Sequence, residues 1–306
     1  MNLPGIIVPI VTPCTATGEP DGSALRVVIE DLRIAGCEGF FVGSSTGRGP
    51  WFTLNQREEI CRIARDDLGD SVTIAAGCMA SGLPVMLENA RAMKDSGADI
   101  AVITAPAYYD YSLSELERLF LTFADRSPLP VMLYDIPGFA RTTLDRDMIL
   151  RLARHERIIG LKDSSGEAER FFRGLEKLEK SLGGTTFFQY QGKERYIAES
   201  LARGAAGFVV SMIHTNPVLF TRLYESARSG DLETASRLQT RINRIMDIVE
   251  SSFAKRPETS TLFHLLEQTL HLRGIDVGIV LDHEGLCPQR IEEAAGSIYS
   301  IAMSDT

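Results

Sequence analysis

One lysine in this chain occupies a position where it could act as a nucleophile. Lys162 lies in a strand-like apolar run after Ile158, Ile159 and Leu161, whereas four of the other five lysines fall in helical segments. Side chains alternate along a strand, so Ile158, Gly160 and Lys162 share one face, and Gly160 would leave space beneath the lysine. A low-dielectric environment disfavours the ammonium form and yields the neutral amine that attacks a carbonyl.

Two other interpretations of this lysine remain open. Lys162 could form a buried ion pair with Asp163, or be a simple charge at the end of a strand. Lys193 is a competing nucleophile, but it lies in a polar helix start and is expected to be solvated.

A tyrosine and a hydroxyl-rich turn could support this lysine. Tyr134 shares a strand face with Met132 and Ile136, and a phenol near an amine can carry protons. The alternative is a core aromatic residue with a satisfied hydroxyl group. The turn Gly43-Ser44-Ser45-Thr46-Gly47 offers backbone N–H groups and hydroxyls, which suit a carboxylate. The alternative is an ordinary polar turn between a strand and a helix.

The elements that would position these residues alternate between strand and helix. Eight short apolar runs read as buried strands; they are Ile6–Pro13, Gly39–Thr46, Val72–Cys78, Ile100–Pro106, Pro130–Pro137, Ile158–Ser164, Thr185–Gly192 and Gly207–Met212. Amphipathic helical stretches separate them, several ending at a glycine, as at Gly36, Gly97 and Gly204.

This alternation predicts an α/β fold, a (β/α)8 TIM barrel over residues 1–214. Four further helices, Asn216–Ala227, Asp231–Phe253, Glu258–Arg273 and Gln289–Met303, predict a C-terminal helical extension over residues 215–306. The rival fold is a doubly wound open sheet, but no G-x-G-x-x-G motif follows the first strand.

The composition of the chain limits the classes of partner and cofactor that we expect. The chain has 306 residues and a net charge of −9, which disfavours nucleic acid and anionic membranes as partners. No signal peptide or membrane span is evident, and the five cysteines lack C-x-x-C spacing, so a cytoplasmic protein with reduced thiols is expected. The five histidines show no metal-site spacing, and neither a metal nor a cofactor is expected.

Together, the turn Tyr134-Asp135-Ile136-Pro137, the segment Gly160-Leu161-Lys162-Asp163 and the turn Ser45-Thr46-Gly47 resemble the dihydrodipicolinate synthase / N-acetylneuraminate lyase family of class I pyruvate aldolases. The resemblance covers nearly the whole chain. It implies a homotetramer, built as a dimer of dimers, that acts on pyruvate and an aldehyde.

The resemblance also implies roles for individual residues. Lys162 would form an imine with the 2-oxo carbon, Tyr134 would carry protons, and Ser45 would continue a hydroxyl relay. A tyrosine after the fourth strand, with Tyr108 the best match and Tyr109 the second choice, would complete the relay from a neighbouring subunit. The substrate-binding set comprises Thr46, which would hold the carboxylate, with Ser44, Gly47, Tyr109, Arg48, Arg141 and Val210.

Three departures from the family pattern bear on the substrate. Arg48 stands where glutamate is frequent, Asp135 where asparagine is common, and Gly138-Phe139 where the lysine-biosynthetic synthases have an arginine. We therefore expect cleavage of a 2-oxo-3-deoxy sugar acid or a 4-hydroxy-2-oxo acid, with Arg48 or Arg141 binding a distal group. Either arginine could instead be a surface charge.

Three alternative functions remain open. They are 4-hydroxy-tetrahydrodipicolinate synthase activity, a deoxy sugar acid dehydratase, and a 2-oxo acid sensor without turnover.

Overall fold

The eight apolar segments form a single parallel sheet that closes on itself. The computed structural model describes residues 3–181, 187–253, 259–278 and 288–304. Each strand pairs in parallel with the next along the chain, and a bridge between Ile6 and Phe208 joins the last strand to the first. The strands are β1 Ile7–Pro9, β2 Gly39–Val42, β3 Thr73–Gly77, β4 Ile100–Ile103, β5 Val131–Asp135, β6 Ile158–Asp163, β7 Phe188–Gln191 and β8 Gly207–Phe208. The predicted (β/α)8 barrel is confirmed, and the open doubly wound sheet is wrong.

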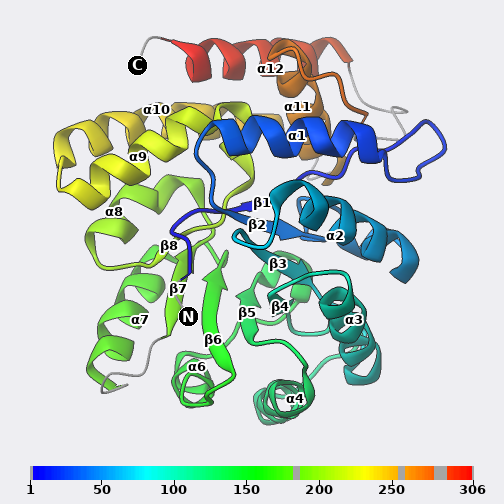
Figure 1. Cartoon of the computed structure of the whole chain (residues 1–306). Helices are drawn as coiled ribbons and strands as arrows, with labels where there is room; N and C mark the ends of the chain where they lie inside the picture. The colour runs from blue at the N-terminus through cyan, green and yellow to red at the C-terminus, as the bar shows by residue number, and fades with distance from the viewer. Residues whose placement is uncertain (1–2, 182–186, 254–258, 279–287, 305–306) are drawn as a thin grey trace.

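Helices surround this barrel (Figure 1). The helices that follow β1 to β7 are α1 Gly22–Ile34, α2 Leu54–Leu68, α3 Leu83–Asp95, α4 Leu113–Arg126, α5 Pro137–Ala140, α6 Arg146–Leu152, α7 Ala168–Ser181 and α8 Ile197–Ala202. The expected glycine stops after α1, α3 and α8 are confirmed: Gly36, Gly97 and Gly204 have φ of 87°, 97° and 91°, a conformation that favours glycine.

All eight predicted strands extend beyond the observed ones, and the first and the last strands are examples. β1 ends at Pro9, and β8 covers two residues before a short 3₁₀ helix, η3 Ser211–Thr215. The buried Glu194 carboxylate explains the second difference, because it accepts hydrogen bonds from the backbone N–H groups of Ser211 and Met212 and from the Ser211 hydroxyl, each at 3.1 Å. Thr185 and Thr186, where the seventh strand was expected to begin, lie outside the described residues.

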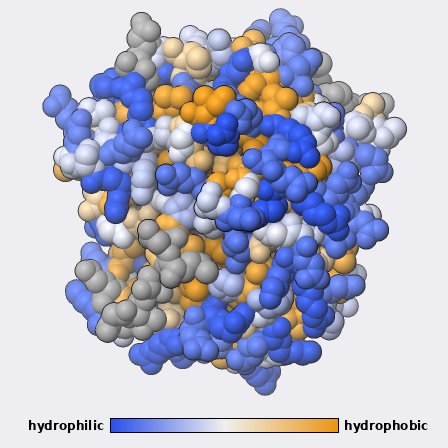
Figure 2. Space-filling model, in the orientation of Figure 1, coloured by the Kyte–Doolittle hydropathy of each residue, from blue (hydrophilic) through white to orange (hydrophobic). Residues whose placement is uncertain are grey.

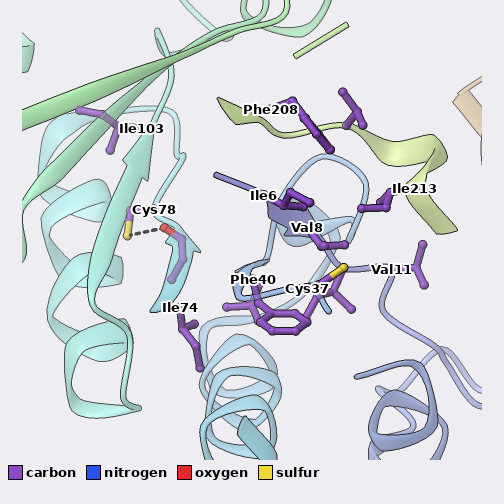
Figure 3. Packing of buried hydrophobic residues seen from close by; sticks show 14 of the residues in the cluster. Ile6, Val8, Val11, Cys37, Phe40, Ile74, Cys78, Ile103, Phe208 and Ile213 are labelled. Atoms are coloured by element: carbon purple, nitrogen blue, oxygen red, sulfur yellow. Dashed lines mark hydrogen bonds between the residues drawn. The ribbon is translucent and has the colours of Figure 1, made fainter. Parts of the chain in front are cut away.

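The core has two layers. Inside the barrel, Ile7, Phe41, Val102, Met132, Tyr134, Tyr190 and Val209 pack together. A larger apolar layer lies between the sheet and the helices. Figure 3 shows part of it, where Ile6, Val8 of β1 and Phe208 of β8 lie near Ile213 of η3. The inner layer therefore supports the side chains that point into the barrel.

The four C-terminal helices are α9 Pro217–Ser229, α10 Leu232–Phe253, α11 Thr259–Leu272 and α12 Pro288–Met303. α9 follows β8 and packs against α8, so it supplies the helix of the eighth β/α unit. α10, α11 and α12 pack on one another, and α12 lies above α1 in Figure 1. The predicted boundary at residues 214 and 215 stays a prediction.

Hydrophilic side chains cover most of the face shown in Figure 2, with smaller hydrophobic patches between them. In the described part of the chain, no helix is both long and apolar enough to cross a bilayer. Cys14, Cys37, Cys61 and Cys78 are buried free thiols, and Cys287 lies outside the described residues.

Candidate active site

Lys162 and Tyr134 face each other at the carboxyl-terminal mouth of the barrel. Each is the second-last residue of its strand, and the two are register partners on β5 and β6. The Lys162 Nζ lies 4.1 Å from the centroid of the Tyr134 ring and 5.4 Å from that of Phe41. Only 4% of Lys162 is exposed. The amine therefore lies against aromatic faces, in the place where α/β barrels carry their reactive groups.

The alternative interpretations of Lys162 are wrong. Asp163 points to the opposite side of β6, where its Oδ1 accepts hydrogen bonds from the Ser165 N–H and hydroxyl, at 2.9 and 2.6 Å. Among the described residues, no carboxylate forms an ion pair with Lys162. Burial also excludes a solvated strand-end charge. The described lysines other than Lys162 are all exposed, including the competitor Lys193.

Gly160 has a structural role that was not expected. A Cβ atom at this position would lie 2.5 Å from the Phe188 carbonyl oxygen and 3.3 Å from the Phe188 Cβ. The missing side chain therefore lets β7 approach β6, while the space under Lys162 stays a prediction.

The turn after β2 is held by its own hydrogen bonds. The Ser44 hydroxyl accepts from the Gly47 N–H at 3.0 Å, and the Gly47 carbonyl accepts from the Thr12 hydroxyl at 2.8 Å. Gly43 has a φ of 61°, which a glycine adopts without strain. The turn is thus a fixed feature beside the Phe41 end of β2. Ser44 and Gly47 shape it, while Ser45 and Thr46 are free to contact a ligand.

Six polar groups on four residues around this mouth have no protein partner in the described part of the chain. Within the part of the chain that the structure describes, no hydrogen bond is made by the Lys162 amine, the Tyr134 hydroxyl, or the hydroxyl and backbone N–H groups of Ser45 and Thr46. None of the side-chain atoms concerned is fully sealed from solvent. Polar groups in largely buried places normally have partners, so this set is suited to receive a polar ligand.

Arg48 is buried, so the interpretation of it as a surface charge is wrong. Its exposed fraction is 2%, and one nitrogen donates to the Thr12 carbonyl at 3.0 Å and to Cys14 Sγ at 2.8 Å. The guanidinium also lies 5.1 Å from the centroid of the Trp51 ring. Burial lowers the pKa of Arg48, and burial likewise raises the pKa of the Cys14 thiol. These contacts fix the arginine against the chain before the turn.

The remaining candidates lie apart from Lys162 within one chain. Tyr108 and Tyr109 are 72% and 64% exposed, and they pack edge to face with ring centroids 4.9 Å apart. Arg141 is exposed, has a φ of 56°, and lies 3.8 Å from the Asp110 carboxylate. Val210 packs in the outer apolar layer, whereas its neighbour Val209 points into the barrel. The structure does not bring these residues to the amine.

Sequence reasoning missed two aromatic residues of the barrel interior, Phe41 near the amine and Tyr190 on the strand beside Lys162. Phe41 of β2 packs edge to face against Tyr134, with centroids 6.3 Å apart. Tyr190 of β7 is the register partner of Lys162 on its other side, and its hydroxyl donates to the Pro4 carbonyl at 2.8 Å. Strand periodicity could have marked both residues as inward-facing. Their position relative to Lys162 depends on how the strands pair, which the sequence of a single strand does not specify.

Comparison with known proteins agrees with this geometry. The model of the dihydrodipicolinate synthetase family matches residues 2–282. The chain belongs to this family. The suspected resemblance is thus confirmed, and the chain is an enzyme of the class I aldolase type.

Individual relatives show the same family. The chain is 33% identical to 4-hydroxy-tetrahydrodipicolinate synthase 1 of Streptomyces coelicolor, over 80% of this chain and 77% of the relative. It is 31% identical to the corresponding synthase of Kineococcus radiotolerans, over 76% and 73% of the two chains.

Solved structures share the fold. A prophage protein of the dihydrodipicolinic acid synthase family from E. coli K12, in complex with pyruvate, superposes with a TM-score of 0.88 at 23% identity, over 98% and 99% of the chains. CdNal from Clostridium difficile, in complex with mannosamine, gives a TM-score of 0.84 at 19% identity, also over 98% and 99%.

Proposed function

We propose that the protein is a pyruvate-dependent lyase that forms a Schiff base on Lys162 and makes or breaks the adjacent carbon–carbon bond. The observation that carries this proposal is the buried amine of Lys162, without a carboxylate partner, 4.1 Å from the Tyr134 ring on the neighbouring strand. Family membership supports the same chemistry.

The proposed reaction begins with the neutral Lys162 amine attacking the ketone carbon of the 2-oxo acid. Loss of water from the carbinolamine gives the imine, whose protonated form draws electrons from the adjacent carbon. In cleavage, the bond to the aldehyde carbon breaks and its electron pair forms an enamine; in condensation, the enamine attacks an aldehyde. Hydrolysis then frees the amine. Tyr134 moves protons in these steps, and Ser45 continues the relay.

The turn after β2 suits the carboxylate of the 2-oxo acid. The Thr46 hydroxyl and the N–H groups of Ser45 and Thr46 are donors without protein partners. Donors fixed on a rigid turn bind an anion without further ordering, which favours affinity.

We propose cleavage of a 2-oxo-3-deoxy sugar acid or a 4-hydroxy-2-oxo acid as the activity. Gly138 and Phe139 follow the Tyr134 turn, and the nearest arginine, Arg141, points to the exposed Asp110. A panel of such acids should therefore release pyruvate. The proposal fails if turnover is confined to condensing pyruvate with aspartate semialdehyde.

The second candidate is that condensation, which forms 4-hydroxy-tetrahydrodipicolinate. It is favoured by the relatives at 33% and 31% identity, which are synthases by name. Product identification separates it from cleavage and from a dehydratase, which would release water and retain the carbon skeleton.

We propose that the active assembly contains several copies of the chain, as a dimer of dimers. Tyr108, Tyr109, Leu113 and Phe139 are large apolar side chains that are exposed in one chain near the barrel mouth. A second copy could cover them and bring Tyr108 to the relay of its neighbour.

A further inference from the structure

A buried charged cluster lies directly behind the reactive pair. Asp135 and Asp163 follow Tyr134 and Lys162, and they are also register partners. Because side chains alternate along strands, both carboxylates point away from the barrel interior, toward α6 and α7. Both are buried. Two carboxylates in such a place repel each other unless a cation lies between them.

Arg170 of α7 supplies this cation. Its Nη2 donates to Asp135 Oδ2 at 2.7 Å and to the Leu144 carbonyl, while Nη1 lies 4.0 Å from Asp163 Oδ2. The Leu144 N–H donates to Asp135 Oδ1 at 3.2 Å. One guanidinium thus joins the ends of both strands that carry the reactive side chains.

A small cavity of about 20 Å³ adjoins this cluster, with Arg146, Asp163, Arg170 and Gln189 among its lining residues. The buried Arg146 Nε and Arg170 Nη1 have no hydrogen-bond partner. The volume is sufficient for one water molecule, which could accept from these donors and donate to Asp163. Such a bridge would close the 4.0 Å gap between Arg170 and Asp163.

We propose that Arg170, Asp135 and Asp163 form a positioning clamp that holds the ends of β5 and β6 in the register that sets Tyr134 against Lys162. The inference rests on the proposed function, and it assigns these residues no contact with substrate.

The clamp depends on pH. Burial and then the charge of Asp163 raise the pKa of Asp135 to about 6, against the opposing hydrogen bond and charge of Arg170. Among the described residues, Asp163 on β6 and Arg170 on α7 are the charged groups that act on this carboxyl. As pH falls through about 6, Asp135 gains a proton and its bond to Arg170 weakens, so kcat should fall in this range.

The test compares Arg170→Met, Asp135→Asn and the double variant with the wild type, using kcat, KM for the 2-oxo acid and the rate at which borohydride traps pyruvate. Arg170→Met should lower kcat and the trapping rate about tenfold or more, because small misplacements of reacting groups are costly. KM should change little, since the turn after β2 is untouched. The double variant should be faster than Arg170→Met, because no second buried carboxylate remains. Asp135→Asn should remove the acid limb near pH 6.

Lys177→Met is the matched control. Lys177 lies on the same helix but forms an exposed ion pair with Asp147, and its loss should leave all these readouts unchanged. A folded Arg170→Met protein with wild-type kcat, or an acid limb that persists in Asp135→Asn, overturns the clamp. If Arg170→Met does not fold, the pH profile of kcat for Asp135→Asn tests the clamp by itself. Absence of pyruvate trapping in the wild type would instead reject the proposed function.

Discussion

At the scale of single residues, the reactive pair depends on how Tyr134 meets Lys162. The phenol ring covers the amine, and its hydroxyl has no protein partner in the described chain. We predict that Tyr134→Phe keeps the ring but slows turnover by about 10²–10⁴-fold, the usual effect of losing a positioned acid or base. Steady-state kinetics on the substrate found by the panel measures this.

Tyr190→Phe is the control for that prediction. Tyr190 is the other register partner of Lys162, but its hydroxyl is bonded to Pro4. Its loss should cost stability and leave kcat close to the wild-type value. Equal losses of kcat in the two variants would contradict a specific role for the Tyr134 hydroxyl.

We also predict that the Thr46 hydroxyl binds the pyruvate carboxylate. The Thr46 hydroxyl and N–H groups have no partner in the described chain and lie in the turn after β2, and the threonine-to-valine change keeps the shape while removing one donor. Thr46→Val should raise KM for pyruvate about tenfold, which corresponds to roughly 1.4 kcal/mol for a hydrogen bond to a charged group. Thr122→Val, on the exposed side of α4, is the control. An unchanged KM would reject the turn as the carboxylate site.

At the scale of elements, the alternation of strands and helices was predictable because most of the strands are short, mainly apolar runs bounded by Gly, Pro or Ser. Lys162 was predictable for the same reason, since a lysine stands out in such a run.

Hydrogen bonds between residues far apart in the sequence were not predictable. The Glu194 carboxylate ends β8 early, and Arg170 joins Asp135 to Asp163; neither contact follows from a local pattern. The burial of Arg48 was not predictable either, because its hydrogen-bond partners, Thr12 and Cys14, lie before the preceding helix.

The contact between η3 and β1 gives a prediction about pH and stability. Burial lowers the pKa of His214 to about 4, and its Nε2 lies 3.2 Å from the Pro9 carbonyl and 3.3 Å from the Val11 nitrogen. Above pH 6.5 the ring is neutral in both folded and unfolded chains. Below that, the unfolded chain binds the proton first, so the free energy of unfolding falls until about pH 4. This single group should remove about 2 kcal/mol between pH 7 and pH 5.

Urea unfolding of His214→Gln at the two pH values measures this contribution. The variant should lose less stability on acidification than the wild type. His271→Gln, which changes an exposed histidine beside Asp276, should keep the wild-type difference. The same loss in His214→Gln as in the wild type would mean that His214 does not cause it.

At the scale of the whole molecule, one chain leaves aromatic side chains exposed near the barrel mouth. We predict that the Tyr108→Ala/Tyr109→Ala variant sediments as a smaller species and loses kcat by about 10²-fold, because a relay hydroxyl is lost with the interface. Ile34→Ala is the control, since Ile34 is an exposed apolar residue at the end of α1, another element of the barrel. Sedimentation velocity measures the assembly. Unchanged mass and kcat in the tyrosine variant would exclude a subunit contact through these residues.

The central claim is that the Lys162 amine captures a 2-oxo acid covalently. Borohydride reduction in the presence of pyruvate, followed by peptide mass mapping, tests it most directly. The reduced pyruvyl group should appear on the peptide that contains Lys162, and Lys162→Ala should abolish both labelling and turnover, while Lys193→Ala retains them. A label on Lys193, or turnover that survives in Lys162→Ala, would contradict the account.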